Sequence, residues 1–523
     1  MDLIALEEEK LENKYKELCK EEYPGRLGKT FKTKRNFYYY DSGTGKVAQI
    51  NENVYKVLTK FLESENFWDF MKLDMSEQEF YKAINEIKDA INKESILSAN
   101  KFDCLTGKTY EQIDEILDNE IQNVTLEVTE KCNLKCKYCI YNESHPEYRA
   151  FGHKNMDWEV AKKAVDFLKA HSQNSDERHI GFYGGEPLIN YDLIKKTTDY
   201  ANKLFDKMIY SMTTNATLMN EEIADYIMRN KFNIIVSLDG YKELHNKNRL
   251  FVSGEGSFEN TIRGLKILLK SAEKYNNKES ITLNMVIEGP DYEDEYDKIQ
   301  LYLNECDWLP NNINILTSSI DYGPHESIYT RPQSYEERMI LKDYYDPILS
   351  WDKKNKKRNK DNTNVLFTDA DVDKAMMIIH KRLLSEKPVK KYGMNGCCVP
   401  GERRIYVTVD GNFKICEKVG DIPEIGNVDK GFDKKRIKEL YFDDFIKEAN
   451  KYCKDCWAIN LCTLCYVNCY DKNGMHFDYR HNSCRSERNY LLGSLIKYHE
   501  ILEENPDVLE EFNEIEFQWN IVN

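Results

Sequence analysis

Three cysteines stand close together at Cys132, Cys136 and Cys139, directly after an apolar run that predicts a strand over Val124–Thr129. Their C-x3-C-x2-C spacing differs from the paired C-x2-C hooks with which zinc ribbons and fingers gather four ligands. No fourth cysteine or histidine is placed to close a tetrahedron. Three thiolates on one short loop can instead hold three irons of a [4Fe–4S] cube and leave the fourth iron open. A stray structural metal loop is the alternative interpretation.

Two later segments also indicate ligand binding. A short strand-like run enters Gly184, Gly185, Glu186 and Pro187, where adjacent glycines allow close backbone approach and proline fixes the exit of the turn. The apolar run 232–240 contains Ser237 near its end, and Arg249 follows twelve residues after that serine. A helix cap at Ser237 and a surface charge at Arg249 are the simpler interpretations.

Short β-rich runs alternate with helical patterns between these motifs, which favours βαβ units and a parallel sheet. A helix is expected over Asp157–Ala170, capped by Asp157. Together with the first strand, the expected strands are Ile180–Tyr183, Tyr210–Thr214, Asn233–Ser237, Ile281–Ile287 and Ile313–Leu316.

In this order, the motifs resemble the signature of the radical S-adenosylmethionine (SAM) enzymes. The resemblance implies a partial (β/α)6 barrel, with the cofactor at the C-terminal mouth of the strands. It also implies that the triplet binds a cube whose open iron chelates SAM. By the same resemblance, the contacts of SAM are Tyr138, Gly184, Gly185, Glu186, Pro187, Ser237 and Arg249.

Nine more cysteines follow residue 395, and three of the 15 are scattered at Cys19, Cys104 and Cys306. The later set resembles the SPASM extension, which binds two auxiliary [4Fe–4S] clusters. The resemblance assigns Cys453, Cys456, Cys462 and Cys484 to an outer cluster. It assigns to an inner cluster Cys416, one of Cys397 and Cys398, and one or both of Cys465 and Cys469. The sequence departs from the family here, because the C-x3-C step after Cys462 would end on Tyr466. Zinc remains the competing metal, since the C-x2-C pairs also fit a zinc ribbon.

The first hundred residues form a separate unit. A helix is expected over Leu3–Glu21, followed by a hairpin with strands Thr30–Tyr40 and Lys46–Ile50. Asn51 is placed to cap one amphipathic helix, and Ser76 with Glu79 forms a capping box that opens another. Before a barrel of this kind, the unit resembles the winged-helix domain that binds the leader of a precursor peptide as an added strand. A helical cap that only packs on the barrel is the alternative.

The expected domains are 1–115 (leader recognition), 116–320 (radical SAM barrel), 321–395 (helical linker region) and 396–523 (SPASM domain). The resemblance implies SAM and three [4Fe–4S] clusters, and a reductant such as flavodoxin or ferredoxin. It predicts a peptide maturase of the ranthipeptide or sactipeptide type. Such an enzyme uses a 5′-deoxyadenosyl radical to take hydrogen from a carbon of a cysteine-rich precursor and installs thioether crosslinks.

Glu417 stands where relatives that oxidise serine or cysteine carry an acidic base, although a lone glutamate is more often a surface residue. Three alternatives to thioether formation stay open: carbon–carbon crosslinking, oxidation of a protein side chain as in sulfatase maturases, and a zinc-stabilised peptide-binding scaffold. A hairpin unit before the barrel favours a peptide maturase over a sulfatase maturase.

The formal charge of −16 disfavours a nucleic-acid partner, because phosphate binding needs a basic field. One basic run, Lys353–Lys360, is expected to be a solvated linker loop or else a rim facing the substrate. No apolar run approaches the length of a membrane span, and the start of the chain does not resemble a signal peptide. We therefore expect a cytoplasmic protein without a disulfide framework.

Overall fold

The computed structural model describes most of the chain. The described ranges are 27–64, 67–99, 108–142, 149–287, 292–310, 313–319, 370–389, 392–393, 396–420, 422–465, 469–471 and 474–514. The predicted helix Leu3–Glu21 and the basic run Lys353–Lys360 lie outside these residues.

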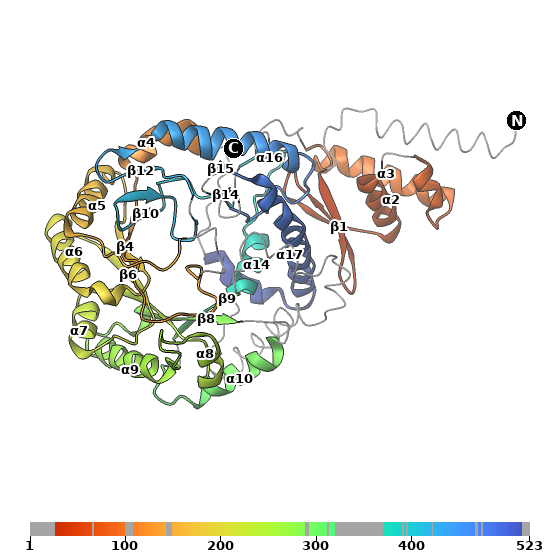
Figure 1. Ribbon diagram of the computed structural model, residues 1–523. Helices are drawn as coiled ribbons and strands as arrows, with labels where there is room; N and C mark the ends of the chain where they lie inside the picture. The colour runs from red at the N-terminus through yellow and green to blue at the C-terminus, as the bar shows by residue number, and fades with distance from the viewer. Residues whose placement is uncertain are drawn as a thin grey trace, which may run out of the picture.

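A curved parallel sheet with helices on its outer side forms the centre of the molecule (Figure 1). Its six strands follow one another in sheet order as they do in sequence, as expected for consecutive βαβ units. They confirm the predicted strands to within a few residues. Their bounds are β4 Asn123–Thr129, β5 His179–Gly184, β6 Ile209–Thr214, β7 Asn233–Ser237, β8 Ile281–Ile287 and β9 Asn314–Ser319.

The helices cover the sheet with one apolar face each. In α5, the buried residues include Ala161, Ala164, Val165 and Leu168, whose three- and four-residue spacing puts them on one face. Asp157 occupies the N-cap position but its side chain makes no capping hydrogen bond, so the predicted helix is confirmed without its predicted cap interaction. The helices of this region are α4 Lys108–Asn119, α5 Trp158–His171, α6 Tyr191–Leu204, α7 Glu221–Arg229, α8 Lys242–Asn248, α9 Phe258–Lys274 and α10 Tyr292–Glu305.

The sheet continues beyond β4 into the cysteine-rich C-terminal region. Strand β10 (Ile405–Val407) pairs in parallel with β4, and β11 (Asn412–Lys414) then pairs antiparallel with β10. Two short strands, β12 (Gly426–Asn427) and β13 (Gly431–Phe432), complete a ten-stranded sheet. The sequence did not predict the pairing of this hairpin with the barrel. Cys416 follows β11 closely, so this pairing fixes its position two strands away from β4 in the same sheet.

The N-terminal unit is a three-stranded antiparallel sheet with strand order β1-β2-β3, packed on two helices. The prediction of one strand over Thr30–Tyr40 is wrong, because a turn divides it. In that turn Thr33 Oγ1 accepts hydrogen bonds from the backbone N–H groups of Arg35 (3.2 Å) and Asn36 (3.0 Å). The elements are β1 Gly28–Lys32, β2 Phe37–Asp41, β3 Val47–Ile50, α2 Glu52–Glu63, η1 Phe67–Lys72 and α3 Glu77–Glu94.

Both predicted caps of this unit are confirmed. The Asn51 side chain accepts from Val54 N–H at the start of α2, and Ser76 and Glu79 form the capping box of α3. Each cap satisfies backbone donors that the first helical turn leaves free. The two helices then bury an apolar face against one side of the sheet.

The other side of this small sheet packs on the C-terminal helices. Successive side chains of a strand point to opposite faces, so Tyr39 packs with α2 and α3 while Tyr38 and Tyr40 face the opposite way. Together with Phe31, these two tyrosines share a buried cluster with the long helix α17 (Phe477–Glu504). Figure 1 shows β1 beside α17. The N-terminal unit is therefore joined to the end of the chain through an apolar core.

The turn between β2 and β3 is also inserted into the C-terminal region. Ser42 Oγ donates to Trp457 O (2.5 Å), and Asn460 Nδ2 donates to Ser42 O (2.6 Å). In addition, Val389 N–H donates to Gly43 O at 2.9 Å. This turn thus contacts the loop that separates two of the later cysteines, Cys456 and Cys462.

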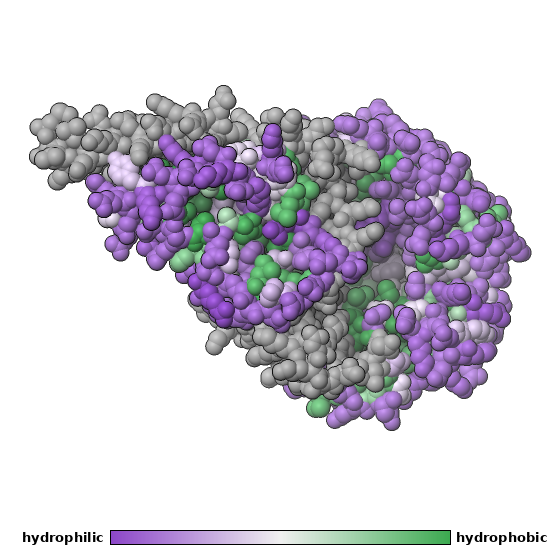
Figure 2. Space-filling view, turned by 180° about the vertical axis from the view of Figure 1, so that it is seen from behind, coloured by the Kyte–Doolittle hydropathy of each residue, from purple (hydrophilic) through white to green (hydrophobic). Residues whose placement is uncertain are grey.

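The rest of the C-terminal region is helical. A π-helical segment, η5, continues directly into α16, and α17 is the longest helix in the described part of the chain. Its further elements are α14 Ala370–His380, α15 Lys434–Arg436, η5 Ile437–Asp444, α16 Phe445–Cys453, β14 Tyr470–Asp471, β15 Gly474–Met475 and η7 Pro506–Glu514. Within the described ranges, no helix is both long and apolar enough to cross a bilayer. The face seen in Figure 2 is mostly hydrophilic, with small scattered apolar patches.

Candidate active site

The loop that carries Cys132, Cys136 and Cys139 begins at the carboxyl end of β4 and is held on two sides by backbone hydrogen bonds. On one side Gly185 N–H donates to Thr129 O (2.9 Å) and Glu186 N–H donates to Lys131 O (2.8 Å). On the other side Lys135 N–H donates to Leu250 O (2.7 Å) and Lys137 N–H donates to Asn248 O (3.1 Å). The three predicted motifs, around residues 132–139, 184–187 and 249, therefore meet at one edge of the sheet.

The two adjacent glycines are required by this contact. A Cβ atom on Gly184 would stand 2.2 Å from Thr129 O, and one on Gly185 would stand 2.1 Å from Lys131 O. Gly184 also adopts a φ of +142°, which residues with a side chain rarely do. The sequence predicted close backbone approach here, and the partner in the structure is the backbone at the start of the cysteine loop.

Glu186 lies beneath the cysteine loop and is buried. Its carboxylate accepts hydrogen bonds from Leu188 N–H (3.1 Å), Thr214 Oγ1 (2.7 Å) and Asn215 N–H (2.8 Å). Burial raises the pKa of this carboxyl, and the three donors oppose that rise. Pro187 follows at the first position of the short helix η2 (Pro187–Asn190), where its missing N–H leaves no hydrogen bond unmade.

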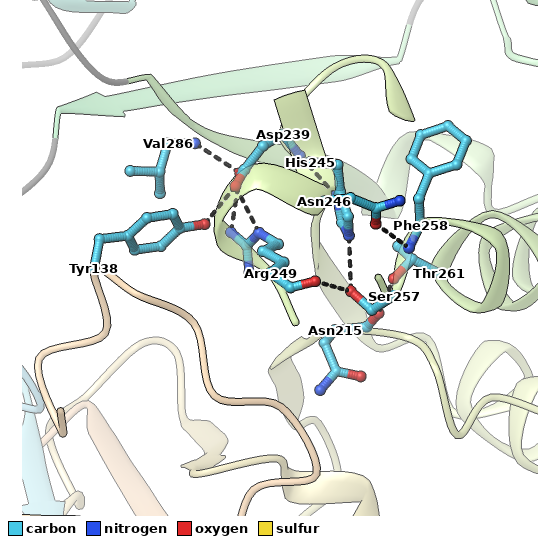
Figure 3. Close-up of polar contacts among 10 residues, drawn as sticks. All are labelled: Tyr138, Asn215, Asp239, His245, Asn246, Arg249, Ser257, Phe258, Thr261 and Val286. Atoms are coloured by element: carbon cyan, nitrogen blue, oxygen red, sulfur yellow. Dashed lines mark hydrogen bonds and ion pairs between the residues drawn. The ribbon is translucent and has the colours of Figure 1, made fainter. Parts of the chain in front are cut away.

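A buried polar network joins the cysteine loop to β7, α8 and α9 (Figure 3). Its centre is Asp239, which accepts from Arg249 Nε (2.9 Å) and Nη2 (3.1 Å) and from Val286 N–H (3.0 Å). Tyr138 Oη, from the cysteine loop, donates to the same carboxylate at 2.5 Å. Predicted contacts Tyr138 and Arg249 are thus brought together through Asp239, to which the sequence assigned no role.

The second half of this network fixes the turn that follows β7. His245 Nδ1 accepts from Asp239 N–H (3.3 Å), and its Nε2 lies 3.0 Å from Ser257 Oγ. Ser257 Oγ in turn donates to Arg249 O (2.8 Å). Since His245 accepts at Nδ1, it is neutral, and burial lowers its pKa to about 3. Ser237 ends β7 at the same edge and is 8% exposed.

The three thiols of the triplet lie in surroundings that disfavour a free thiolate. Burial raises the pKa of Cys132 and Cys139, and it raises that of Cys136 to about 11 although Arg249 opposes the rise. A bound metal cation deprotonates such thiols directly. Within the described ranges no group of three or more His, Cys, Asp or Glu side chains converges as the ligands of a single ion do. Ligands of a cube bind different irons and need no such convergence.

Four of the later cysteines line one cavity. Cys453 ends α16, Cys456 and Cys462 belong to the following loop, and Cys484 comes from α17. These are the four residues predicted to hold the outer auxiliary cluster. Phe445, Ala458, Ile459 and Leu464 supply apolar lining. The donor set fits a cube with four thiolate ligands.

The other later cysteines gather near the end of β11. Cys397 is buried and its Sγ lies 3.9 Å from Leu464 O, while Cys398 is exposed. Burial raises the pKa of Cys416 to about 12, and Cys465 is among the charges that contribute to the rise. Cys469 is also buried, with Sγ 3.7 Å from Cys465 O. The structure thus places Cys397, Cys416, Cys465 and Cys469 in one region.

Glu417, the predicted base, is held by Arg404, whose Nη1 donates to Glu417 Oε1 at 2.5 Å. Its side chain is 12% exposed. Tyr183, at the end of β5, is near enough for Glu417 and Cys139 to contribute to its raised pKa, although burial contributes most. Glu417 therefore lies on the barrel side of the cysteine-rich region, towards the triplet.

A further buried charged group was not predicted. Glu127 is 1% exposed on β4, and Arg149 Nε donates to its Oε1 at 2.6 Å. The Arg149 guanidinium also lies 3.8 Å from the centre of the Tyr141 ring. Glu127 Oε2 accepts from Val409 N–H (3.2 Å), which links the barrel to the C-terminal region. An acidic residue between Leu126 and Val128 in a predicted strand was the signal that could have identified it.

Comparison with known proteins assigns the central domain. Residues 126–300 match the model of the Radical SAM superfamily. The chain therefore carries a radical SAM domain over these residues. This domain implies binding of SAM and of a [4Fe–4S] cluster.

Several curated proteins are similar to this chain over part of its length. The radical SAM cyclopropyl synthase TigE of Paramaledivibacter caminithermalis is 29% identical over 255 residues, 45% of this chain and 52% of TigE. The subtilosin biosynthesis protein AlbA of Bacillus subtilis is 35% identical over 149 residues, 28% of this chain and 30% of AlbA. A cysteine-type anaerobic sulfatase-maturating enzyme of Clostridium perfringens is 25% identical over 348 residues, 65% of this chain and 85% of the enzyme.

The chain spans about half the length of some of these relatives, 58% of an uncharacterised protein of Methanocaldococcus jannaschii and 52% of TigE. Among solved structures, native anSMEcpe with bound AdoMet and a Cp18Cys peptide superposes with a TM-score of 0.53 at 23% identity. That match covers 76% of this chain and 99% of the other. It confirms the predicted α/β radical SAM fold.

Proposed function

We propose that this enzyme is a maturase of a cysteine-rich, ribosomally made precursor peptide and that it installs thioether crosslinks. The observation that carries the proposal is the cavity in which Cys453, Cys456, Cys462 and Cys484 meet, next to a second group of cysteines and beside a radical SAM barrel. Peptide maturation is supported by the likeness to AlbA and TigE, whose names describe a bacteriocin biosynthesis protein and a cyclopropyl synthase.

The proposed cofactors are SAM and three [4Fe–4S] clusters. Cys132, Cys136 and Cys139 hold the first, and the four cysteines of the cavity hold the outer auxiliary cluster. For the inner cluster we favour buried Cys397 over exposed Cys398, together with Cys416, Cys465 and Cys469. When bound, these groups supply the one-electron cleavage of SAM, whose radical takes hydrogen from a peptide carbon, and a route by which the surplus electron leaves.

The protein's own residues position these groups. The backbone hydrogen bonds at Gly185, Glu186, Lys135 and Lys137 fix the cysteine loop, and Asp239 holds Arg249 and Tyr138 beside it. Buried Glu186 supplies a carboxylate suited to the SAM ammonium group, and Arg249 supplies a guanidinium suited to a carboxylate. Glu417, which is held by Arg404 and lies near Tyr183, is the proposed acceptor of a proton from a bound peptide.

The N-terminal sheet supports recognition of a leader peptide. Among the described residues, strand β3 pairs with β2 on one side and with no strand on the other. Its other edge is therefore available for an added strand. Exposed Gln49 lies on this strand. Strand addition would supply affinity through main-chain hydrogen bonds, independent of the peptide region to be crosslinked. The electrons would come from a small reductant such as flavodoxin or ferredoxin.

The test is an anaerobic reaction with SAM, a reductant and the short cysteine-rich peptides encoded by neighbouring reading frames. A thioether removes two hydrogen atoms per crosslink, and the modified cysteine no longer reacts with a thiol-alkylating reagent. The same mass loss with every thiol still reactive would indicate carbon–carbon crosslinks and contradict the thioether proposal. The chain with alanine at Cys132, Cys136 and Cys139 is the control and should leave the peptide unchanged.

Oxidation of a serine or cysteine side chain is the second candidate. It is supported by the sulfatase-maturating enzyme of Clostridium perfringens, of which this chain matches 85%, and by the fold likeness to anSMEcpe. Its product would be an aldehyde, which a hydrazide probe detects and which a thioether product lacks. Analysis of metals separates both enzymes from a zinc scaffold, because three cubes require about 12 irons and matching sulfide per chain.

A further inference from the structure

The cavity of the four later cysteines contains one cationic side chain. Among its described lining residues, Arg488 is the only base and Glu487 the only acid. Both come from α17, as does Cys484. Residues three and four positions apart share one face of a helix, so α17 presents a ligand, an anion and a cation to the same space.

Glu487 is hydrogen-bonded to the loop that carries Cys462. Its Oε1 accepts from Thr463 N–H (2.7 Å) and from Thr463 Oγ1 (2.8 Å), directly after Cys462. This contact fixes the loop of Cys462 against α17. Arg488 has no ion pair or hydrogen bond to another residue in the described part of the chain, so its charge is not neutralised by a carboxylate there.

A permanent positive charge in this cavity has a defined effect on a cluster. A guanidinium stays protonated at any physiological pH. A cube with four thiolate ligands is anionic and gains one more negative charge on reduction, without making or breaking a bond. The charge of a neighbouring cation therefore stabilises the reduced form more than the oxidised form. The apolar lining strengthens the effect, because it lowers the local dielectric constant.

We propose that Arg488 sets the reduction potential of the outer auxiliary cluster, raising it so that the cluster accepts an electron more readily. Arg488 is a positioning residue in this sense: it acts through the cluster and not on the peptide. The inference rests on the proposed function, since it requires that Cys453, Cys456, Cys462 and Cys484 hold a cube. Net charge and hydrogen bonding near a cluster are among the protein's main means of adjusting its potential.

The test is an anaerobic redox titration, followed by electron paramagnetic resonance, of the full chain. Alanine at Cys132, Cys136 and Cys139 removes the SAM-site cluster and leaves the auxiliary signals. In this background Arg488→Gln should lower one of the two midpoint potentials by about 59 mV or more, a tenfold change in a one-electron equilibrium. Arg488→Lys, which keeps the charge, should have midpoint potentials close to those of the parent.

Arg485→Gln is the matched control, because Arg485 lies on the same helix, is exposed and does not line the cavity. It should leave both potentials unchanged. An equal shift in Arg488→Gln and Arg485→Gln, or in Arg488→Gln and Arg488→Lys, would overturn the role of the cavity charge. If Arg488→Gln lost its iron, Glu487→Gln would decide the question, since removal of the anion should raise the same midpoint and a fall would refute the proposal.

Iron and sulfide analysis distinguishes a failure of the proposal for Arg488 from a failure of the proposed function. The parent chain for these variants, with alanine at Cys132, Cys136 and Cys139, should keep about eight irons. If it holds none, the cluster assignment itself is wrong and the proposal for Arg488 falls with it. If it holds them and the midpoint does not respond to position 488, only the role of Arg488 is wrong.

Discussion

Arg249 and Asp239 form a two-point ion pair in the interior of the barrel mouth, with Nε and Nη2 of the arginine 2.9 and 3.1 Å from the two carboxylate oxygens. Their side chains are 7% and 1% exposed. Because Tyr138 donates to the same carboxylate, the pair also holds the cysteine loop. An arginine expected to meet a ligand is thus already oriented by the protein.

Replacing Asp239 by Asn should destabilise the folded state by about 3–5 kcal/mol, because it leaves the Arg249 charge buried without a counterion. Chemical denaturation of the full chain measures the change, and SAM affinity should fall with it. Glu259→Gln is the control, since its pair with Lys242 is exposed and should contribute little to stability. Equal losses in the two variants would contradict a special role for the buried pair.

Replacing Cys132, Cys136 and Cys139 by alanine should remove roughly four irons per chain and all cleavage of SAM, because these residues are the proposed protein ligands of one cube. The auxiliary clusters should remain, since their cysteines come from other segments. Cys306→Ala, outside both groups, should change neither quantity. Formation of 5′-deoxyadenosine by the triple variant would show that the SAM site lies elsewhere.

A proline at Gln49 should weaken leader binding without unfolding the N-terminal sheet. Asp41 N–H donates to Lys46 O, and hydrogen-bonded and non-hydrogen-bonded pairs alternate along an antiparallel ladder. In the register Tyr39↔Ala48 and Tyr38↔Gln49, the N–H of Gln49 therefore faces the free edge of β3. Gln49→Pro removes a donor that an added strand needs.

Titration of a labelled leader peptide measures this effect, with a loss of tenfold or more expected. Ala48→Pro is the contrasting variant, because it removes a donor to β2 and should lower the stability of the sheet itself. An unchanged affinity for the leader in Gln49→Pro would mean that β3 is not the docking edge.

Stability should fall in mild acid partly because of His499. Its ring packs between α17 and the N-terminal sheet, with Phe31 and Tyr38 at centroid distances of 5.1 and 4.9 Å. Burial lowers its pKa to about 4, whereas an unfolded chain titrates near 6.5. As the pH falls from about 6.5 to 4, the unfolded state binds a proton that the folded state does not. The free energy of unfolding therefore falls by up to about 3 kcal/mol.

The variant His499→Asn keeps a donor for Leu495 O and should flatten the pH dependence of the free energy of unfolding between pH 6.5 and 4. His153→Asn, at an exposed position, should leave this pH dependence unchanged. Parallel slopes for the parent and His499→Asn would show that other groups account for the acid sensitivity.

Local patterns predicted the barrel well, because each strand is a short apolar run between helical segments and each motif stands at a strand end. The strand Asn233–Ser237 was predicted without error, and Asn51 and Ser76 cap the helices they were expected to cap. The cysteine groups were also accessible to sequence reasoning, since cysteines with these spacings have few uses other than metal binding. Their roles stay predictions until metals are measured.

Contacts between distant segments were not predictable in this way. The pairing of β10 with β4 depends on tertiary packing, and no local pattern in Ile405–Val407 predicts it. The turn at Thr33 was missed because the aromatic residues on both sides continue one strand-like alternation. Asp239 and Arg488 gain their importance from neighbours far away in sequence.

The apolar face formed by Phe31, Tyr38 and Tyr40 has a consequence for how the protein is made. The helix that covers this face, α17, begins more than 400 residues later in the chain. At a ribosomal rate of about 5–20 residues per second, the aromatic face waits on the order of 20–90 s for its partner. During that interval an unpaired strand edge and an uncovered aromatic surface are exposed together. Fragments that end before α17 should therefore aggregate on expression, and a chaperone that binds nascent chains should raise the yield of the full-length protein.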